Sequence, residues 1–91
     1  MNKSDFVYVI AEKAGLTKRD AERATDAVFE AIVEVMQAGG KVQFPGFGAF
    51  SARRRAAFTG RHPKTGEPLP IPETMVPVFE PSRQLKEKVN R

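Results

Sequence analysis

The sequence contains no cysteine, and its 91 residues include a single histidine. Without cysteine neither a disulfide nor a thiolate metal site can form, and one histidine cannot build a zinc site alone. There is also no nucleophile–base pair and no glycine-rich phosphate loop that opens a helix. We therefore expect no cofactor, no small-molecule substrate and no enzymatic activity.

Long apolar stretches are missing as well. No apolar run approaches the length of a membrane span, and the first residues, MNKSDF, lack the apolar core of a signal peptide. These features predict a cytosolic protein without a membrane partner.

The chain is short enough to be one small domain. A domain of this size buries only about two-thirds of the surface that its unfolded chain exposes, so its stability is marginal. Since no disulfide can add stability, we expect association with a second chain to do so.

Charge is distributed unevenly along the sequence. Residues 1–40 carry five Lys or Arg and seven Asp or Glu, a net charge of −2, whereas residues 41–91 carry ten and four, a net charge of +6, which gives +4 for the whole chain. A basic half beside a nearly neutral half predicts a localised surface for a polyanion. The alternative is ordinary solubilising charge.

Start and stop signals predict a first helix near the N-terminus. Ser4 is a good N-cap residue, and Asp5 lies where the helix dipole favours an anion. Gly15 is the expected stop, so the helix spans about ten residues.

A second helix of about twenty residues follows, with Thr17 as its N-cap, Asp20 three residues later, and Gly39–Gly40 at its end. Two helices joined by a tight turn also fit a helix-turn-helix reader. The second helix is acidic, however, and phosphates would repel it; its acids are Glu22, Asp26, Glu30 and Glu34.

Alternating apolar residues predict a short strand over Lys41–Phe44 and, after a Pro45–Gly46 turn, a longer strand over Gly48–Phe58. Beyond Ala52 the longer strand offers nothing large to bury. We expect it to leave the core there and continue as an arm that carries three arginines, Arg53, Arg54 and Arg55.

A basic turn over Gly60–Gly66 forms the tip of this arm. The return strand, Glu67–Pro72, has proline at every second position, so all three missing N–H groups point to the same side. This pattern fits a two-stranded ribbon whose prolines face the free edge, with the ladder kept through Leu69 and Ile71.

Apolar alternation resumes over Thr74–Phe79, which we expect to re-enter the sheet. Ser82 is the predicted N-cap of a last short helix, in which Leu85 and Val89 form the apolar pair.

Three motifs carry a resemblance to a known family: GFGAF at residues 46–50, the tip TGRHPKTG at residues 59–66, and the closing VPVFEPSRQLKEKV at residues 76–89. In this order and spacing the chain resembles the HU and integration host factor family of bacterial DNA-bending proteins over essentially residues 1–91. The resemblance implies an α+β fold with two N-terminal helices, a short antiparallel β-sheet extended into a long two-stranded β-arm, and a short C-terminal helix, in an intertwined dimer.

The resemblance also implies a division of labour within one HU-like domain. Residues 1–40 would form the helical dimerisation region, residues 41–80 the sheet with an arm over about residues 53–75, and residues 82–91 the C-terminal helix. Phe47, Phe50 and Phe79 match the core that joins the subunits.

The implied function is that of an architectural, nucleoid-associated protein that binds and bends double-stranded DNA with little sequence specificity, as a homodimer. It would favour bent, nicked or gapped DNA. Pro63 matches a wedge that enters between base pairs from the minor groove. The other matching DNA-binding positions are Lys3, Arg53, Arg55, Arg61, His62, Lys64, Arg83 and Lys86.

Alternatives remain for the function and for single residues. The chain also fits a site-preferring subunit similar to integration host factor, in a heterodimer, or a module that grips an acidic partner or a membrane surface. Pro63 also fits a simple turn proline, and His62 a loop-tip spectator. Five residues depart from the family pattern, namely Phe58, His62, Pro70, Glu80 and Ser82.

Overall fold

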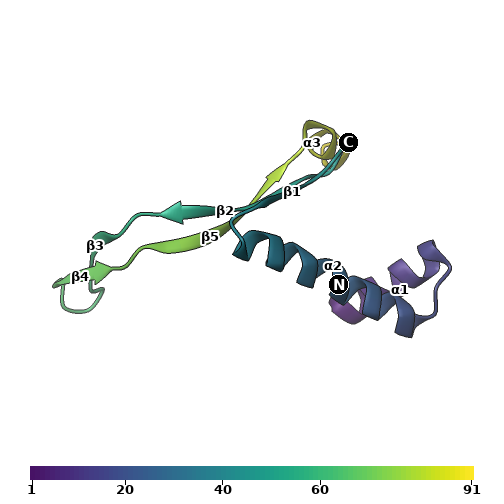
Figure 1. The fold of residues 1–91 in the computed structure, drawn as a ribbon, viewed down its shortest axis with the longest axis horizontal. Coiled ribbons are helices and arrows are strands. Elements are labelled where there is room, and N and C mark those ends of the chain that lie inside the picture. The colour runs from purple at the N-terminus through teal and green to yellow at the C-terminus, as the bar shows by residue number, and fades with distance from the viewer. The chain divides into compact units, whose positions relative to one another are not determined.

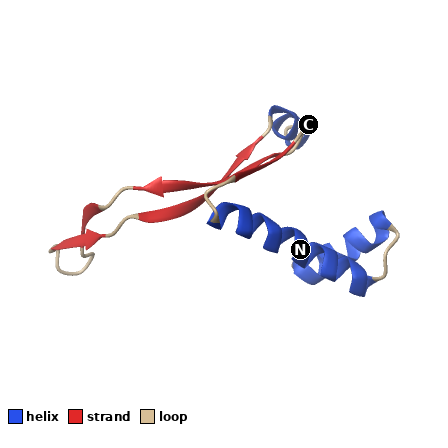
Figure 2. Cartoon of the chain, in the orientation of Figure 1, coloured by secondary structure: helices blue, strands red, loops and turns tan.

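The computed structural model describes all 91 residues of the chain. Its elements in chain order (Figure 1) are α1 Lys3–Ala14, α2 Lys18–Gln37, β1 Lys41–Phe44, β2 Gly48–Arg55, β3 Phe58–Arg61, β4 Pro68–Ile71, β5 Thr74–Pro81 and α3 Arg83–Val89. This order confirms the predicted α+β fold (Figure 2). The chain divides into two compact units, Met1–Glu34 and Val35–Arg91. No helix combines the length and apolar character that crossing a membrane requires.

The N-cap of α1 is Asn2, so the prediction of Ser4 is wrong. The Asp5 N–H donates to the Asn2 side-chain oxygen at 2.9 Å, and the Asn2 N–H donates to the Asp5 carboxylate at 3.3 Å. This reciprocal pair is a capping box, which needs an acid three residues after the cap. Ser4 has Val7 in that place, and the helix therefore starts two residues earlier than predicted. Its predicted end is confirmed, since Gly15 is the left-handed C-cap.

The core of the first unit lies between α1 and α2. Val7 and Ala21 are fully buried, Ala11 is nearly so, and Ile10 packs against them. The Thr17 hydroxyl accepts a hydrogen bond from the Asp20 N–H at 3.1 Å, as its predicted cap role requires. Short side chains at these contact positions allow the two helices to approach closely, and little apolar surface is buried by this unit on its own.

The second unit is a three-stranded antiparallel sheet, in the order β1-β2-β5, with the separate β3–β4 pair beyond it. β1 and β2 are joined by the predicted Pro45–Gly46 turn, in which the Phe47 N–H donates to the Phe44 carbonyl at 3.0 Å. Gly46 has a φ of 79°, as the third residue of a type II turn does, and glycine adopts this φ without strain. At Gly48 a Cβ would lie 2.6 Å from the Glu80 carbonyl oxygen and 2.7 Å from the Phe79 ring, so only glycine fits there.

Four phenylalanines form the apolar centre of the second unit. The Phe50 and Phe79 ring centroids are 4.7 Å apart, those of Phe47 and Phe79 are 5.5 Å apart, and Phe44 meets Phe50 edge-on at 6.3 Å. After these residues the Ser82 side chain accepts from the Leu85 N–H at 3.1 Å, which confirms the predicted N-cap of α3.

The pairs β2–β5 and β3–β4 follow one another along a two-stranded ribbon, and prolines in its return strand, β4 and β5, face the free edge. The Ser82 N–H donates to the Phe47 carbonyl, and at the other end the His62 N–H donates to the Glu67 carbonyl, both at 2.9 Å. Hydrogen bonds alternate along antiparallel strands, so these two bonds set which residues bond across the ribbon. The backbone N–H and C=O groups of Leu69 and Ile71 therefore point toward the partner strand. Those of the alternate positions in β4 and β5 point toward the free edge, and the prolines at these positions are Pro68, Pro70, Pro77 and Pro81. The predicted ladder through Leu69 and Ile71 is confirmed, but Pro72, the third proline of the predicted pattern, lies after the end of β4 and belongs to no ladder.

The prediction of one continuous strand over Gly48–Phe58 is wrong, because β2 ends at Arg55 and β3 begins at Phe58. Within one antiparallel ladder, the residues of a strand that bond to its partner are an even number of positions apart. Phe47 and His62, which make the two bonds, are an odd number of positions apart. The two ladders are therefore out of phase by one residue. A single ladder cannot hold both phases. Pairing is therefore interrupted over Ala56–Ala57 and, on the return strand, over Pro72–Glu73; we call these four residues the joint.

Candidate nucleic-acid interface

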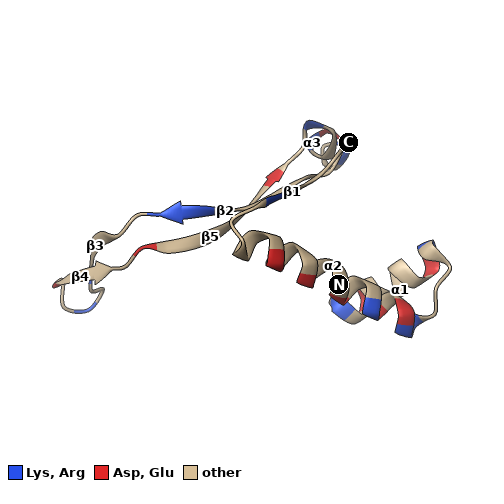
Figure 3. Ribbon diagram, viewed as in Figure 1, with Lys and Arg blue, Asp and Glu red and all other residues tan.

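The three arginines at the end of β2 lie on the exposed part of the ribbon and have three different partners. Arg53 Nη2 lies 3.0 Å from Glu80 Oε1, and Arg54 Nη2 lies 2.6 Å from Glu73 Oε2. No carboxylate is paired with Arg55; its guanidinium carbon lies 4.6 Å from the centre of the Phe58 ring. As Figure 3 shows, this cationic end of β2 precedes the β3–β4 pair along the ribbon.

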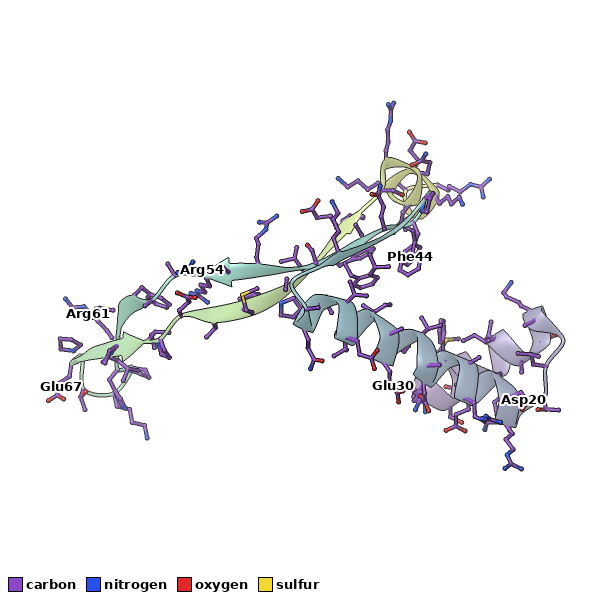
Figure 4. The ribbon with its side chains drawn as sticks, in the orientation of Figure 1. Asp20, Glu30, Phe44, Arg54, Arg61 and Glu67 are labelled. Carbon is purple, nitrogen blue, oxygen red and sulfur yellow. The ribbon has the colours of Figure 1, made fainter.

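The tip of the ribbon is a closed, fully exposed loop between β3 and β4. The Gly66 N–H donates to the His62 carbonyl at 2.9 Å, and Arg61 Nη1 donates to the Gly66 carbonyl at 3.3 Å. His62 Nδ1 accepts from the Lys64 N–H at 3.2 Å. These bonds leave the Pro63 ring at the exposed turn of the loop (Figure 4 labels Arg61 and Glu67 at its two ends). An exposed proline on a loop held by hydrogen bonds is suited to insert into another surface without a large loss of conformational entropy.

The remaining predicted site residues lie on helices. Arg83 and Lys86 are on α3, and Arg83 Nε lies 3.2 Å from Glu87 Oε1 one turn further on. Lys3 belongs to the first unit, where its ammonium group lies 2.8 Å from Asp26 Oδ1. The hydrogen bond and charge of Asp26 raise the pKa of Lys3 above its ordinary value of 10.5, so Lys3 stays cationic to a higher pH than an isolated lysine.

The ribbon therefore brings together most of the predicted site residues. Six of them lie on β2, β3 or the tip, in the order Arg53, Arg55, Arg61, His62, Pro63 and Lys64. Sequence reasoning missed the acidic partners, because Glu80 and Arg53 are 27 residues apart and meet only through the strand register. It also missed the contact between Arg55 and Phe58, although Phe58 was among the residues that depart from the family pattern.

Comparison with known proteins decides the family. A sequence model of the family described as "Bacterial DNA-binding protein" matches residues 1–90. The chain belongs to this family. DNA-binding protein HU-1 of Halalkalibacterium halodurans is 52% identical over 90 residues, which cover 99% of this chain and 100% of that protein. DNA-binding protein HU of Geobacillus stearothermophilus is 49% identical over 89 residues, covering 98% and 99% of the two chains.

Solved HU structures share the fold of this chain. Anabaena HU, in a cocrystal with DNA, superposes with a TM-score of 0.92 at 45% sequence identity and covers 98% of this chain and 97% of its own. HU from Thermotoga maritima gives a TM-score of 0.69 at 34% identity, with 98% of both chains covered. Membership of the family thus rests on the whole chain and does not depend on the arm motif alone.

Proposed function

We propose that this protein is an architectural protein of the bacterial nucleoid that binds and bends double-stranded DNA with little sequence specificity. The observation that carries the proposal is the match, over nearly the full length of both chains, to an HU that was solved with DNA. A match of this extent includes the ribbon and its tip, which are the parts expected to touch DNA.

The charges of the second unit support a DNA ligand. Residues 41–91 carry the net charge of +6, and all of their cations except Lys41 and Arg91 lie on the exposed end of β2, on the tip with the end of β3, or on α3. Phosphates of a duplex are spaced closely along the groove, and a ribbon with arginines at intervals can contact several of them. Such contacts position the protein without reading sequence.

We assign the tip to the minor groove and Pro63 to a wedge between base pairs. Support comes from the exposed Pro63 ring and from the loop hydrogen bonds on both sides of it. An apolar wedge replaces base stacking at the step it opens and kinks the duplex, at a deformation cost of a few kcal/mol. DNA that is already bent, nicked or gapped has met part of that cost, so we expect it to be preferred.

A homodimer completes the proposal. In the first unit an apolar groove is lined by Phe6, Ile10, Ala24, Thr25, Val28 and Phe29, and both phenylalanines are about half exposed. In the second unit Phe44, Phe47 and Phe79 keep more than a third of their surface exposed, although their rings touch. So much exposed aromatic surface in a 91-residue chain indicates a second copy as its cover.

The test compares binding to three duplexes of one length: linear with random sequence, nicked, and gapped. Gel-shift titrations at several salt concentrations should give binding to all three, tighter on the nicked and gapped duplexes, with affinity falling steeply as salt rises. Strong preference for one linear sequence would instead favour a site-specific subunit. Absence of binding to any duplex at low salt would reject the proposal.

A further inference from the structure

Phe58 has no charge and was not among the predicted DNA-binding residues. We propose that Phe58 is a positioning residue for DNA binding, whose ring holds the Arg55 guanidinium in a fixed place across the joint with its charge and donors free. The inference rests on the proposed function, since it names how one contact of that same surface is prepared.

Arg55 differs from its two neighbours in what holds it. Arg53 and Arg54 each use a guanidinium nitrogen on a carboxylate, at 3.0 and 2.6 Å, and each pair offsets one positive charge. Only after leaving Glu80 and Glu73 can these two arginines offer a phosphate their uncompensated charge and all five donors. Arg55 has no such pair, so it is the one arginine of the three whose charge is not already offset by a neighbouring acid.

The aromatic contact keeps the guanidinium available. A cation–π contact is an attraction between the guanidinium charge and the ring, and it pairs none of the five N–H donors with a hydrogen-bond acceptor. At 4.6 Å from the ring centre, the Arg55 guanidinium is within the range of a cation–π interaction. The ring therefore restricts the side chain without using the groups that would bind a phosphate oxygen or a base edge.

The position of the ring explains why it is suited to this task. Arg55 is the last residue of β2 and Phe58 the first of β3, so their contact spans Ala56–Ala57, where strand pairing is interrupted. Phe58 itself is paired with Ile71 on the return strand, and its ring borders a shallow apolar groove with Pro70 and Pro72. The ring thus belongs to the β3–β4 pair, whereas the arginine that it holds in place belongs to β2.

The test uses two replacements of Phe58 that separate an aromatic face from apolar bulk. Phe58→Tyr keeps the ring face, and Phe58→Leu keeps an apolar side chain but has no ring. Both variants, Arg55→Ala, and the double variant Arg55→Ala with Phe58→Leu are titrated with linear and nicked duplex over a range of salt. Thermal unfolding of each variant checks that the fold is retained, which the 41% exposure of Phe58 favours.

We expect Phe58→Leu to lose about two- to fivefold in affinity per arm, and Phe58→Tyr to bind as wild type. Phe58→Leu should also flatten the salt dependence as Arg55→Ala does, because a loosened Arg55 no longer holds its phosphate. The double variant should be no weaker than Arg55→Ala.

Three results would overturn the inference while leaving DNA binding in place. The first is that Phe58→Leu binds DNA with wild-type affinity. The second is that Phe58→Tyr loses as much affinity as Phe58→Leu. The third is that the affinity losses of Arg55→Ala and Phe58→Leu multiply in the double variant. A wild-type protein that binds no duplex would instead reject the proposed function. As a matched control, Arg53→Ala combined with Phe58→Leu should show multiplying losses, because Arg53 is held by Glu80 and not by the ring.

Discussion

Glu80 on β5 holds Arg53 on β2: the Arg53 Nη2 atom lies 3.0 Å from Glu80 Oε1 across the ribbon. The register makes this contact diagonal, since Arg53 is paired with Val76 and Glu80 with Ala49. Both side chains are more than half exposed. A phosphate that binds Arg53 therefore competes with a carboxylate that is already in place.

Removing that competitor should strengthen DNA binding. Glu80→Gln keeps the side-chain shape and frees Arg53, and an exposed ion pair is worth up to about 1 kcal/mol, so we expect a gain of up to about fivefold in affinity. Gel-shift titration at one salt concentration measures it. The control is Glu12→Gln, which makes the same charge change on an unpaired, exposed acid of α1 and should have a much smaller effect. Equal gains in both variants would show that only net charge matters.

The salt dependence of binding should depend on the arginines of the arm. Each phosphate contact contributes about 0.9 to the slope of log affinity against log salt, so replacing Arg53 and Arg55 by Ala in both subunits should reduce the slope by about two to four. Arg19 and Arg23 on α2 offer a matched pair; their replacement by Ala should leave the slope nearly unchanged. An unaltered slope in the Arg53 and Arg55 variant would mean that these residues do not contact phosphates.

Pro63→Ala should reduce bending without reducing electrostatic attraction. The variant keeps every charge, so its salt slope should match wild type, whereas an alanine cannot replace the stacking of an opened base step. Fluorescence transfer between the duplex ends, at saturating protein, should show a smaller bend, and the preference for nicked DNA should fall. If the bound duplex is bent as strongly as by wild type, Pro63 only shapes the turn.

Dimerisation should make stability depend on concentration. The unfolding temperature of wild type should rise with protein concentration, as it does for obligate dimers. Phe29→Gln places a polar group on the 55% exposed phenylalanine of the α1–α2 groove and should lower the unfolding temperature and favour monomer. Met75→Gln, at a 56% exposed position on the arm, should change neither. A wild-type midpoint independent of concentration, with a monomer mass, would reject the dimer.

The ion pair between Lys3 and Asp26 should appear as an alkaline pH dependence. Asp26 raises the pKa of Lys3 above 10.5 in the folded protein, so the stabilisation is fully present below pH 10.5 and is lost as pH rises through the raised pKa. Asp26→Asn should return the pKa of Lys3 to near 10.5, measured by NMR titration. The difference in unfolding midpoint between wild type and Asp26→Asn should shrink above pH 10.5. A Lys3 pKa that does not respond to Asp26→Asn would show that the pair does not form in solution.

Local features of the fold followed from the sequence because they depend on residues a few positions apart. The C-cap at Gly15, the turn at Pro45–Gly46 and the N-cap at Ser82 each need only one turn of chain. The alternating prolines determined the edge of the return strand, since a missing N–H can be tolerated only where no partner strand lies. Asn2 and Ser4 are both suitable N-cap residues, and the prediction chose Ser4. Asp5, three positions after Asn2, completes the capping box and makes Asn2 the N-cap.

Tertiary structure decided what no local pattern contains, namely the phase of each ladder and the partners of each charge. Hydrogen bonds at the two ends of the ribbon are out of phase by one residue, and this mismatch creates the joint at Ala56–Ala57. Strand pairing brings Glu73 to Arg54 and Glu80 to Arg53 from 19 and 27 residues away. Charge counts predicted a basic arm, but only the register determined that Arg55 is the arginine left without an acid, because pairing fixes which side chains can reach one another.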